Sequence, residues 1–185
     1  MKRIKILILA LTLQIANSYG ATNENNNYDI KFNQNNYEVK TLTINGQTIK
    51  YRAFEKIVYV KNPVDTKYEI MNFYVPEDYY LGKKINGYSI DTVPIFLPNE
   101  IGGYMPAEPG VPKTGMKGNE PNAIFVALSK GYVVASPGAR GRTIKDETGE
   151  FFTGKAPAGI VDLKAAVAYL HYNDNLMAGD SNKII

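Results

Sequence analysis

The sequence contains no cysteine and a single histidine, His171. Without cysteine the chain cannot form a disulfide scaffold, use a cysteine nucleophile or bind a metal through thiolates. A single histidine also leaves too few ligands for the usual zinc sites, so we expect no metal and no cofactor. The absence of cysteine fits any cellular compartment, and the location must therefore be inferred from another part of the sequence.

The apolar run at the N-terminus is too short to cross a bilayer. It covers residues 6–16, whereas a membrane-spanning helix needs about 20 apolar residues. Basic residues precede this run and the small residues Ser18 and Gly20 follow it, which is typical of a secretory signal peptide. We therefore predict a signal peptide at residues 1–20, a secreted or periplasmic location, and no membrane span once the peptide is removed.

The chain without its signal peptide has no excess of either charge. Three of the 21 Lys and Arg residues lie in residues 1–20, which leaves 18 basic residues against 18 acidic ones. A neutral body gives no electrostatic reason to expect nucleic acid or an acidic membrane as a partner. We therefore predict no nucleic-acid partner.

The length and composition indicate one domain after an N-terminal extension. The chain has 185 residues and 44% hydrophobic content, which is enough for one domain with a core. Residues 21–36 are rich in asparagine and offer almost no apolar surface to offset their ordering entropy. We predict that they form a flexible lead-in and that the domain covers residues 37–185.

The first half of this domain has the period-two pattern of strands. Residues 37–44 and 49–60 alternate in this way on either side of an Asn-Gly turn signal, which predicts an antiparallel hairpin. Residues 68–76 predict a third strand that ends at Pro76. Residues 92–99 are almost entirely apolar, which favours a strand buried on both faces.

The second half changes to a period of about 3.6. Residues 121–131 predict a helix, because Pro121 lies near its start and Gly131 occupies the position just after its end. A buried strand then begins at Tyr132 and ends at Pro137.

Residues 156–173 predict the clearest helix of the chain, with an apolar stripe at positions 160, 163, 167 and 170. Residues 182–185 have the pattern of a strand that has only begun. The alternation of strands and helices predicts an α/β fold. We expect a mostly parallel sheet that is flanked by helices, preceded by antiparallel strands and incomplete.

No serine of the mature chain has the frame of a nucleophile on a sharp strand-to-helix turn. Such a turn needs small residues two positions to either side of the serine. Ser136 is followed by Pro137, where no helix begins, and Lys183 replaces the second small residue after Ser181. His171 lies near the end of the predicted long helix, where we interpret it as a cation near the helix dipole or a half-buried ring. A catalytic role for His171 is the alternative.

Acidic residues divide into one buried candidate and two surface pairs. Asp162 lies in the inner half of an otherwise apolar helix, and a buried carboxylate needs a bidentate partner. We predict a structural ion pair with Arg140 or Arg142 that fixes the loop after the strand. The adjacent acids at 77–78 and at 146–147 are interpreted as solvated surface.

The segment PNEIGGYMP, residues 98–106, is the best remaining catalytic candidate. It follows a buried strand, and Gly102 and Gly103 let backbone amides turn toward a ligand without obstruction by a Cβ. A plain turn is the alternative.

Three segments, TVPIFLPNEIGGYMP, PNAIFVALSKGYVVASPGARGRT and GKAPAGIVDLKAAVAYL, together resemble the N-terminal part of bacterial tannases. Tannases are secreted or cell-associated α/β-hydrolases that cleave galloyl esters. The resemblance covers about residues 65–185 and is strongest over 92–170. The same layout is similar, more loosely, to that of feruloyl esterases and other carboxylesterases.

The resemblance implies an α/β-hydrolase-type fold in which the loop that contains Gly102, Gly103 and Tyr104 supplies one oxyanion amide, with a glycine favoured. It also implies that the strand begun at 182–185 leads to the nucleophilic serine. The Ser, Asp and His of the triad would then all lie beyond Ile185, so the chain alone would be inactive.

We therefore hypothesise that the chain is the N-terminal portion of a secreted serine ester hydrolase. It would act through an acyl-enzyme on a small-molecule ester of gallate or another aromatic acid. The alternative is a secreted module with a binding or structural role and no catalysis.

Overall fold

A computed structural model of the protein describes residues 27–115, 118 and 120–185. The predicted signal peptide and residues 21–26 of the predicted lead-in lie outside these residues. All the helices and strands that were expected from the sequence lie within them.

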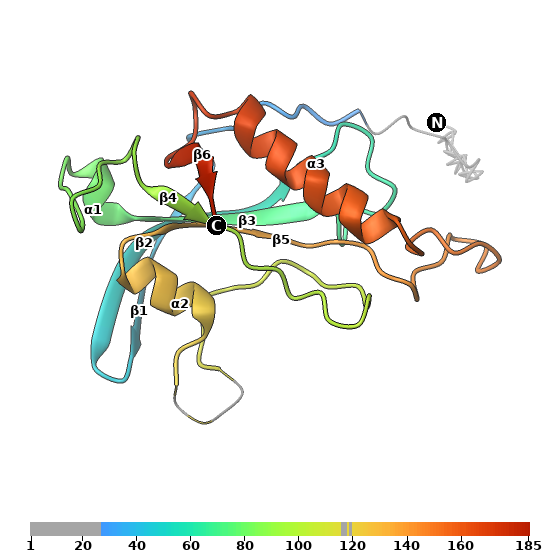
Figure 1. Cartoon of the computed structure of the whole chain (residues 1–185), viewed down its shortest axis with the longest axis horizontal. Helices are drawn as coiled ribbons and strands as arrows, with labels where there is room; N and C mark the ends of the chain where they lie inside the picture. The colour runs from blue at the N-terminus through green and yellow to red at the C-terminus, as the bar shows by residue number, and fades with distance from the viewer. Residues whose placement is uncertain (1–26, 116–117, 119) are drawn as a thin grey trace, which may run out of the picture.

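The fold is built on a sheet of six strands (Figure 1). In the sheet they lie in the order β1-β2-β3-β5-β4-β6. The strands are β1 (Glu38–Ile44), β2 (Gln47–Val58), β3 (Ile70–Pro76), β4 (Pro94–Phe96), β5 (Val133–Pro137) and β6 (Asp180–Ile184). The helices are α1 (Glu77–Tyr80), α2 (Ala123–Ser129) and α3 (Ala158–Tyr172).

The sheet is mixed: the expected antiparallel N-terminal strands are confirmed, but the sheet of the described residues is not mostly parallel. Strands β1, β2, β3 and β5 pair antiparallel along the sheet. Only β4 is paired in parallel, with β5 on one side and β6 on the other. The period-two first half of the chain supplies β1, β2 and β3 in direct succession, and short connections between consecutive strands favour antiparallel pairs.

Local turn and cap residues explain where two of the elements begin and end. Asn45 and Gly46 both have positive φ, 50° and 77°, as a two-residue hairpin turn requires. At the start of α2 the Asn122 side chain accepts a hydrogen bond from the Phe125 amide at 3.1 Å. Gly131, at φ 86°, follows the end of α2 in the left-handed conformation expected there.

Two helices cover opposite faces of the sheet: in Figure 1, α3 lies above it and α2 below it. Successive residues of β3 therefore enter different cores, because side chains alternate across a strand. Phe73 and Val75 pack in the cluster that includes α3, whereas Tyr74 packs in the cluster that includes α2. The α3 cluster includes Phe54, Met71, Val133, Ala135, Ala166 and Leu170, and the α2 cluster includes Ile49, Tyr51, Ile124, Phe125, Leu128 and Val134.

Helix α3 is rotated relative to the stripe expected from its sequence. Its buried residues are Gly159, Asp162, Ala166, Tyr169 and Leu170, while Ile160 is 63% exposed. The expected stripe is therefore correct at 170 but wrong at 160. The inward face contains Asp162, because its carboxylate binds Arg140, which lies just after β5.

The described part of the expected lead-in, residues 27–36, packs against the core through Phe32. The Phe32 ring is 6% exposed and belongs to the α3 cluster. The Phe32 amide donates to Asn173 Oδ1 at 2.8 Å, and Asn173 Nδ2 donates to the Ile30 carbonyl at 3.0 Å. One buried aromatic ring and these two hydrogen bonds hold a segment whose composition is otherwise polar.

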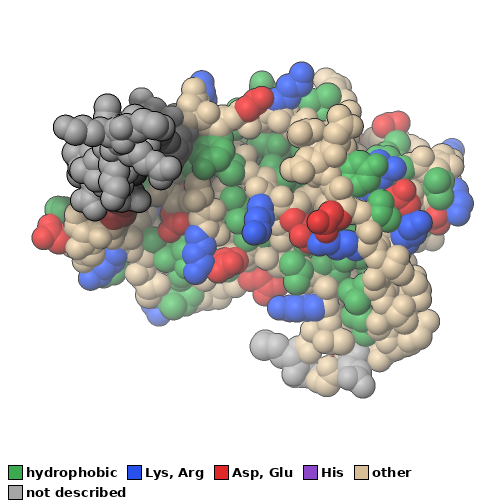
Figure 2. Space-filling model, turned by 180° about the vertical axis from the view of Figure 1, so that it is seen from behind, with side chains coloured by type: hydrophobic (Ala, Val, Ile, Leu, Met, Phe, Trp, Pro, Cys, Tyr) green, Lys and Arg blue, Asp and Glu red, His purple; other side chains and the backbone are tan. Residues whose placement is uncertain are grey.

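Charges of both signs are interspersed on the face shown in Figure 2, with hydrophobic side chains between them. Within the part of the chain that the structure describes, no helix is long and apolar enough to cross a membrane.

Candidate functional site

The carboxyl ends of the three parallel strands meet at one edge of the sheet. In α/β sheets this edge is where ligands bind. Strand β4 runs into a long loop at this edge, and the Leu97 amide donates to the Ile185 carbonyl at 2.8 Å. The Ile185 amide in turn donates to the Ile95 carbonyl at 2.9 Å. The end of β6 therefore lies beside the start of the loop that contains Gly102 and Gly103.

The backbone of that loop leaves amide groups available. Gly103 and Tyr104 have φ values of 59° and 63°, so two consecutive residues are left-handed. The Met105 amide donates to the Gly102 carbonyl at 3.0 Å and closes the turn. Among the described residues, the Gly102 and Gly103 amides donate no backbone hydrogen bond. A Cβ placed on either glycine would meet no atom within 4 Å, so a ligand can approach here.

The rest of the loop is bound to the segment that follows β5. The Tyr104 carbonyl accepts from the Arg142 amide at 2.8 Å, and Ala107 and Ala139 exchange two backbone hydrogen bonds of 3.1 and 2.9 Å. Gly141 packs so closely that a Cβ on it would collide with Pro106. These contacts fix the Gly102–Gly103 turn relative to β5.

Arg140 and Asp162 lie in one buried ion pair, which joins the same segment to α3. Arg140 Nη2 is 2.7 Å from Asp162 Oδ1, and Arg140 Nε donates to Asp162 Oδ2 at 3.0 Å. The Arg140 backbone amide donates to the same Oδ2 at 2.9 Å. Asp162 is 2% exposed and Arg140 8%. Of the two arginines considered from the sequence, Arg140 forms the pair, and Arg142 contributes its backbone to the loop.

A second carboxylate, Glu69, shares this buried region. Glu69 Oε1 lies 3.6 Å from Arg140 Nη2, and Glu69 Oε2 accepts from the Asp65 amide at 2.7 Å. Burial raises the pKa of Glu69, with a smaller contribution from the charge of Asp162. The hydrogen bond to Asp162 raises the pKa of Arg140, which keeps the guanidinium charged. The Arg140 guanidinium therefore lies beside the two buried carboxylates of Asp162 and Glu69. We infer that this cluster has a structural role.

The serines that were considered from the sequence are engaged in other contacts. Ser136 is fully buried, and its Oγ accepts from the Gly110 amide at 2.9 Å. Ser181 Oγ lies 3.0 Å from His171 Nδ1, a contact that the sequence did not predict. Ser181 is only 4% exposed and is the second residue of β6, at the edge opposite to Gly102 and Gly103. This Ser–His contact therefore ties α3 to β6 and does not converge with the free amides.

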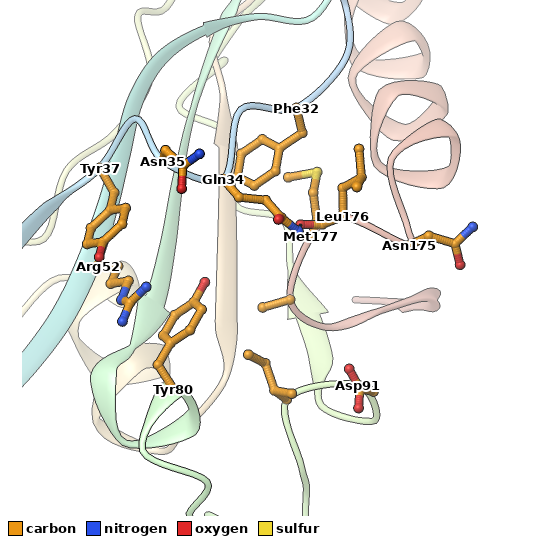
Figure 3. A pocket seen from close by; sticks show the side chains of 12 residues that line it. Phe32, Gln34, Asn35, Tyr37, Arg52, Tyr80, Asp91, Asn175, Leu176 and Met177 are labelled. Atoms are coloured by element: carbon orange, nitrogen blue, oxygen red, sulfur yellow. Dashed lines mark hydrogen bonds between the residues drawn. The ribbon is translucent and has the colours of Figure 1, made fainter.

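A cavity of about 350 Å³ lies at the opposite edge, where β4 and β6 begin (Figure 3). Arg52 stacks on the rings of Tyr37 and Tyr80, with its Cζ at 4.3 and 3.6 Å from their centroids. Arg52 Nε also donates to Glu77 Oε2 at 3.0 Å. Burial raises the pKa of Tyr80 to about 12. The cavity is thus separate from the Gly102–Gly103 turn.

Of the two acids at 77–78 that we interpreted as solvated surface, only Asp78 is exposed. Glu77 is 9% exposed and pairs with Arg52, whereas Asp78 is exposed and pairs with Lys83 at 3.0 Å. In the second pair, Glu147 is exposed, whereas Asp146 is partly buried. Across residues 27–115, 118 and 120–185, no group of three His, Asp or Glu side chains could hold a metal.

The chain is similar to solved tannase structures. The crystal structure of Fusobacterium nucleatum tannase is 54% identical with a TM-score of 0.82, over 85% of this chain and 32% of that one. Tannase from Lactobacillus plantarum is 38% identical with a TM-score of 0.77, over 84% and 33% of the two chains. A tannin acyl hydrolase solved with ethyl gallate is 39% identical with a TM-score of 0.77, over 84% and 34%.

The chain thus spans about a third of the length of the tannases that it matches. Neither a scan against protein-family models nor a search of curated proteins found a match.

The ion pair predicts a large difference between two Asp→Asn substitutions. Asp162→Asn should lower the free energy of unfolding by about 3 to 5 kcal/mol, because it leaves the Arg140 charge buried without its partner. Asp78→Asn is the matched control in an exposed pair and should cost less than about 0.5 kcal/mol. Urea unfolding of the natural gene product measures both, and equal losses would contradict the structural role of the pair.

The raised pKa of Glu69 predicts a dependence of stability on pH. The folded chain holds the Glu69 proton more tightly than the unfolded chain, whose glutamate pKa is about 4.3. The stability contributed by the proton is complete below that value and is lost as the pH rises through the higher folded-state pKa. Glu69→Gln stays neutral, so its melting temperature should rise relative to wild type as the pH increases above about 4.

Glu108→Gln is the control for this measurement. Glu108 lies in an exposed pair with Lys67, and its side chain is 61% exposed. Melting curves in steps of pH would contradict the prediction if both variants followed the wild-type pH dependence.

Proposed function

The chain is tannase-like in sequence and fold, and on this premise we propose that it is the N-terminal portion of a serine carboxylic ester hydrolase that cleaves esters of gallate or related aromatic acids. The observation that carries the proposal is the 54% identity, at a TM-score of 0.82, with Fusobacterium nucleatum tannase. A similar tannin acyl hydrolase was solved with ethyl gallate, an aromatic ester. Since this chain spans about a third of those proteins, the catalytic residues would lie in the part of the enzyme that it does not cover.

The arrangement of the elements supports an α/β-hydrolase-type fold. Strands β5, β4 and β6 are parallel, with α2 and α3 on opposite faces of the sheet. In such folds the nucleophile follows the end of a parallel strand, and one oxyanion donor comes from the loop after a neighbouring strand. Here β4 and β6 are neighbours, and the loop after β4 contains Gly102 and Gly103.

The backbone amides of the loop would act on the negative charge that develops during ester cleavage. When a nucleophile adds to the ester carbonyl, its oxygen becomes an oxyanion, and fixed N–H donors stabilise this state more than the ground state. The Gly102 and Gly103 amides have no acceptor in the described part of the chain. They therefore need to break no hydrogen bond with the described residues before they donate to a substrate oxygen.

The hydrogen bond between Leu97 and Ile185 supports the position proposed for the nucleophile. A serine that follows the end of β6 would begin beside the loop, because the Leu97 amide and the Ile185 carbonyl are 2.8 Å apart. We propose that this serine attacks the ester and forms the acyl-enzyme. The Asp and His that complete the triad would come later in the same enzyme.

The sequence pattern of residues 1–20 supports export of the enzyme to the periplasm or the medium. We propose a small-molecule aromatic ester as its partner.

The first test compares the natural gene product with residues 21–185 expressed alone, using methyl gallate and p-nitrophenyl acetate. The natural product should hydrolyse methyl gallate, and residues 21–185 should not exceed the buffer rate. Turnover by residues 21–185 that survives replacement of every serine would overturn the proposal. A natural product that ends at Ile185, unfolds in one sharp transition and is inactive would instead favour the non-catalytic module.

Gly103→Ala tests the oxyanion loop. Gly103 has φ 59°, a conformation that disfavours a Cβ, so the substitution should turn its amide away and lower kcat about 10-fold or more with little change in KM. Gly46→Ala imposes the same kind of strain, at φ 77° in the β1–β2 turn, and should leave kcat unchanged. Steady-state kinetics on methyl gallate that are equal for the two variants would contradict an oxyanion role.

A further inference from the structure

Tyr104 holds an unusual backbone conformation directly beside the free amides. Its φ of 63° is left-handed, a region that a bulky side chain rarely occupies. Such conformations persist where the surrounding contacts fix them, and they occur often at functional sites. Glycine or asparagine would adopt this conformation more easily, so the tyrosine side chain must itself contribute to the structure.

The Tyr104 ring reaches the first turn of α3. A Cβ on Gly159 would lie 3.9 Å from Tyr104 Cε1 and from Cζ, so the ring lies directly over this glycine. The Tyr104 hydroxyl is buried, and it has no hydrogen-bond partner among the residues described. A buried hydroxyl without a partner is unfavourable. The ring therefore occupies this position in spite of both the backbone conformation and the unpaired hydroxyl.

The contacts of Tyr104 lie on both sides of the turn that presents the amides. Its carbonyl is held by the Arg142 amide at 2.8 Å, and its ring is held by α3. Gly102 and Gly103 have no side chains and, apart from the 3.0 Å bond that closes the turn, no described backbone hydrogen bond. Their orientation therefore depends on the residue that follows them.

We propose that Tyr104 is a positioning residue: its ring, docked on Gly159, sets the direction of the Gly102 and Gly103 amides toward the substrate oxygen. This inference rests on the proposed ester hydrolase function. Tyr104 does not touch the reacting atoms, and it acts through the peptide groups that precede it. We assign the role to the ring, because the hydroxyl forms no hydrogen bond with the described residues.

The test uses the natural gene product with the variants Tyr104→Asn and Tyr104→Phe. Asparagine tolerates the left-handed conformation, so Tyr104→Asn removes the ring without new backbone strain. Its kcat on methyl gallate should fall about 10- to 100-fold while KM stays within about 3-fold, because misplaced donors weaken transition-state stabilisation. Tyr104→Phe keeps the ring and should restore most of the lost kcat.

An arylboronic acid, which forms a tetrahedral adduct with a serine nucleophile, supplies a second readout. Its affinity for Tyr104→Asn should fall by about the same factor as kcat, since both depend on the oxyanion donors. Tyr172→Asn is the matched control, because Tyr172 is 67% exposed at the other end of α3. This variant should keep the wild-type kcat and boronate affinity.

The possible outcomes separate the two proposals. An active wild type whose Tyr104→Asn variant keeps its kcat, or loses only melting temperature, overturns the role of Tyr104 alone. A Tyr104→Phe variant as impaired as Tyr104→Asn also overturns it, because the hydroxyl would then be the working group. A wild type without ester turnover overturns both proposals.

Discussion

The buried pair between Arg140 and Asp162 is the interaction on which the candidate site depends. It joins the end of β5 to α3 through two side-chain contacts and one backbone hydrogen bond. Removing a pair of charges from water is costly, and this cost is offset only where the geometry is bidentate and further hydrogen bonds are made. Because Asp162 must face inward, the pair also sets the rotation of α3 about its axis.

Glycines allow the segment that the ion pair fixes to pack directly against the loop after β4. A Cβ on Gly141 would collide with Pro106, and one on Gly154 would collide with Gly141. Three backbone segments therefore stack in direct contact, which only residues without a Cβ permit. The loop lies against the segment that the ion pair fixes, so Gly102 and Gly103 are held although no side chain of their own anchors them.

In the mixed sheet, the antiparallel strands and the parallel strands contribute in different ways. The antiparallel strands β1, β2 and β3 enlarge both hydrophobic cores, whereas the parallel strands β4, β5 and β6 bring their carboxyl ends to a single edge. The amides that we propose as oxyanion donors lie at that edge. The Arg52 cavity and the Ser181–His171 contact lie at the other edge, where the parallel strands begin.

The sequence alone predicts the six strands and the helices α2 and α3, but not the short α1, because hairpin turns, helix caps and hydrophobic periods depend on neighbouring residues. It also indicated the Asp162 pair, since a carboxylate on an apolar helix face needs a partner. The tertiary structure alone set the sheet order, the rotation of α3 and the packing of residues 27–36 through Phe32. It also decided that the Tyr104 ring packs on Gly159. These features arise from contacts between residues far apart in the chain, which no local pattern records.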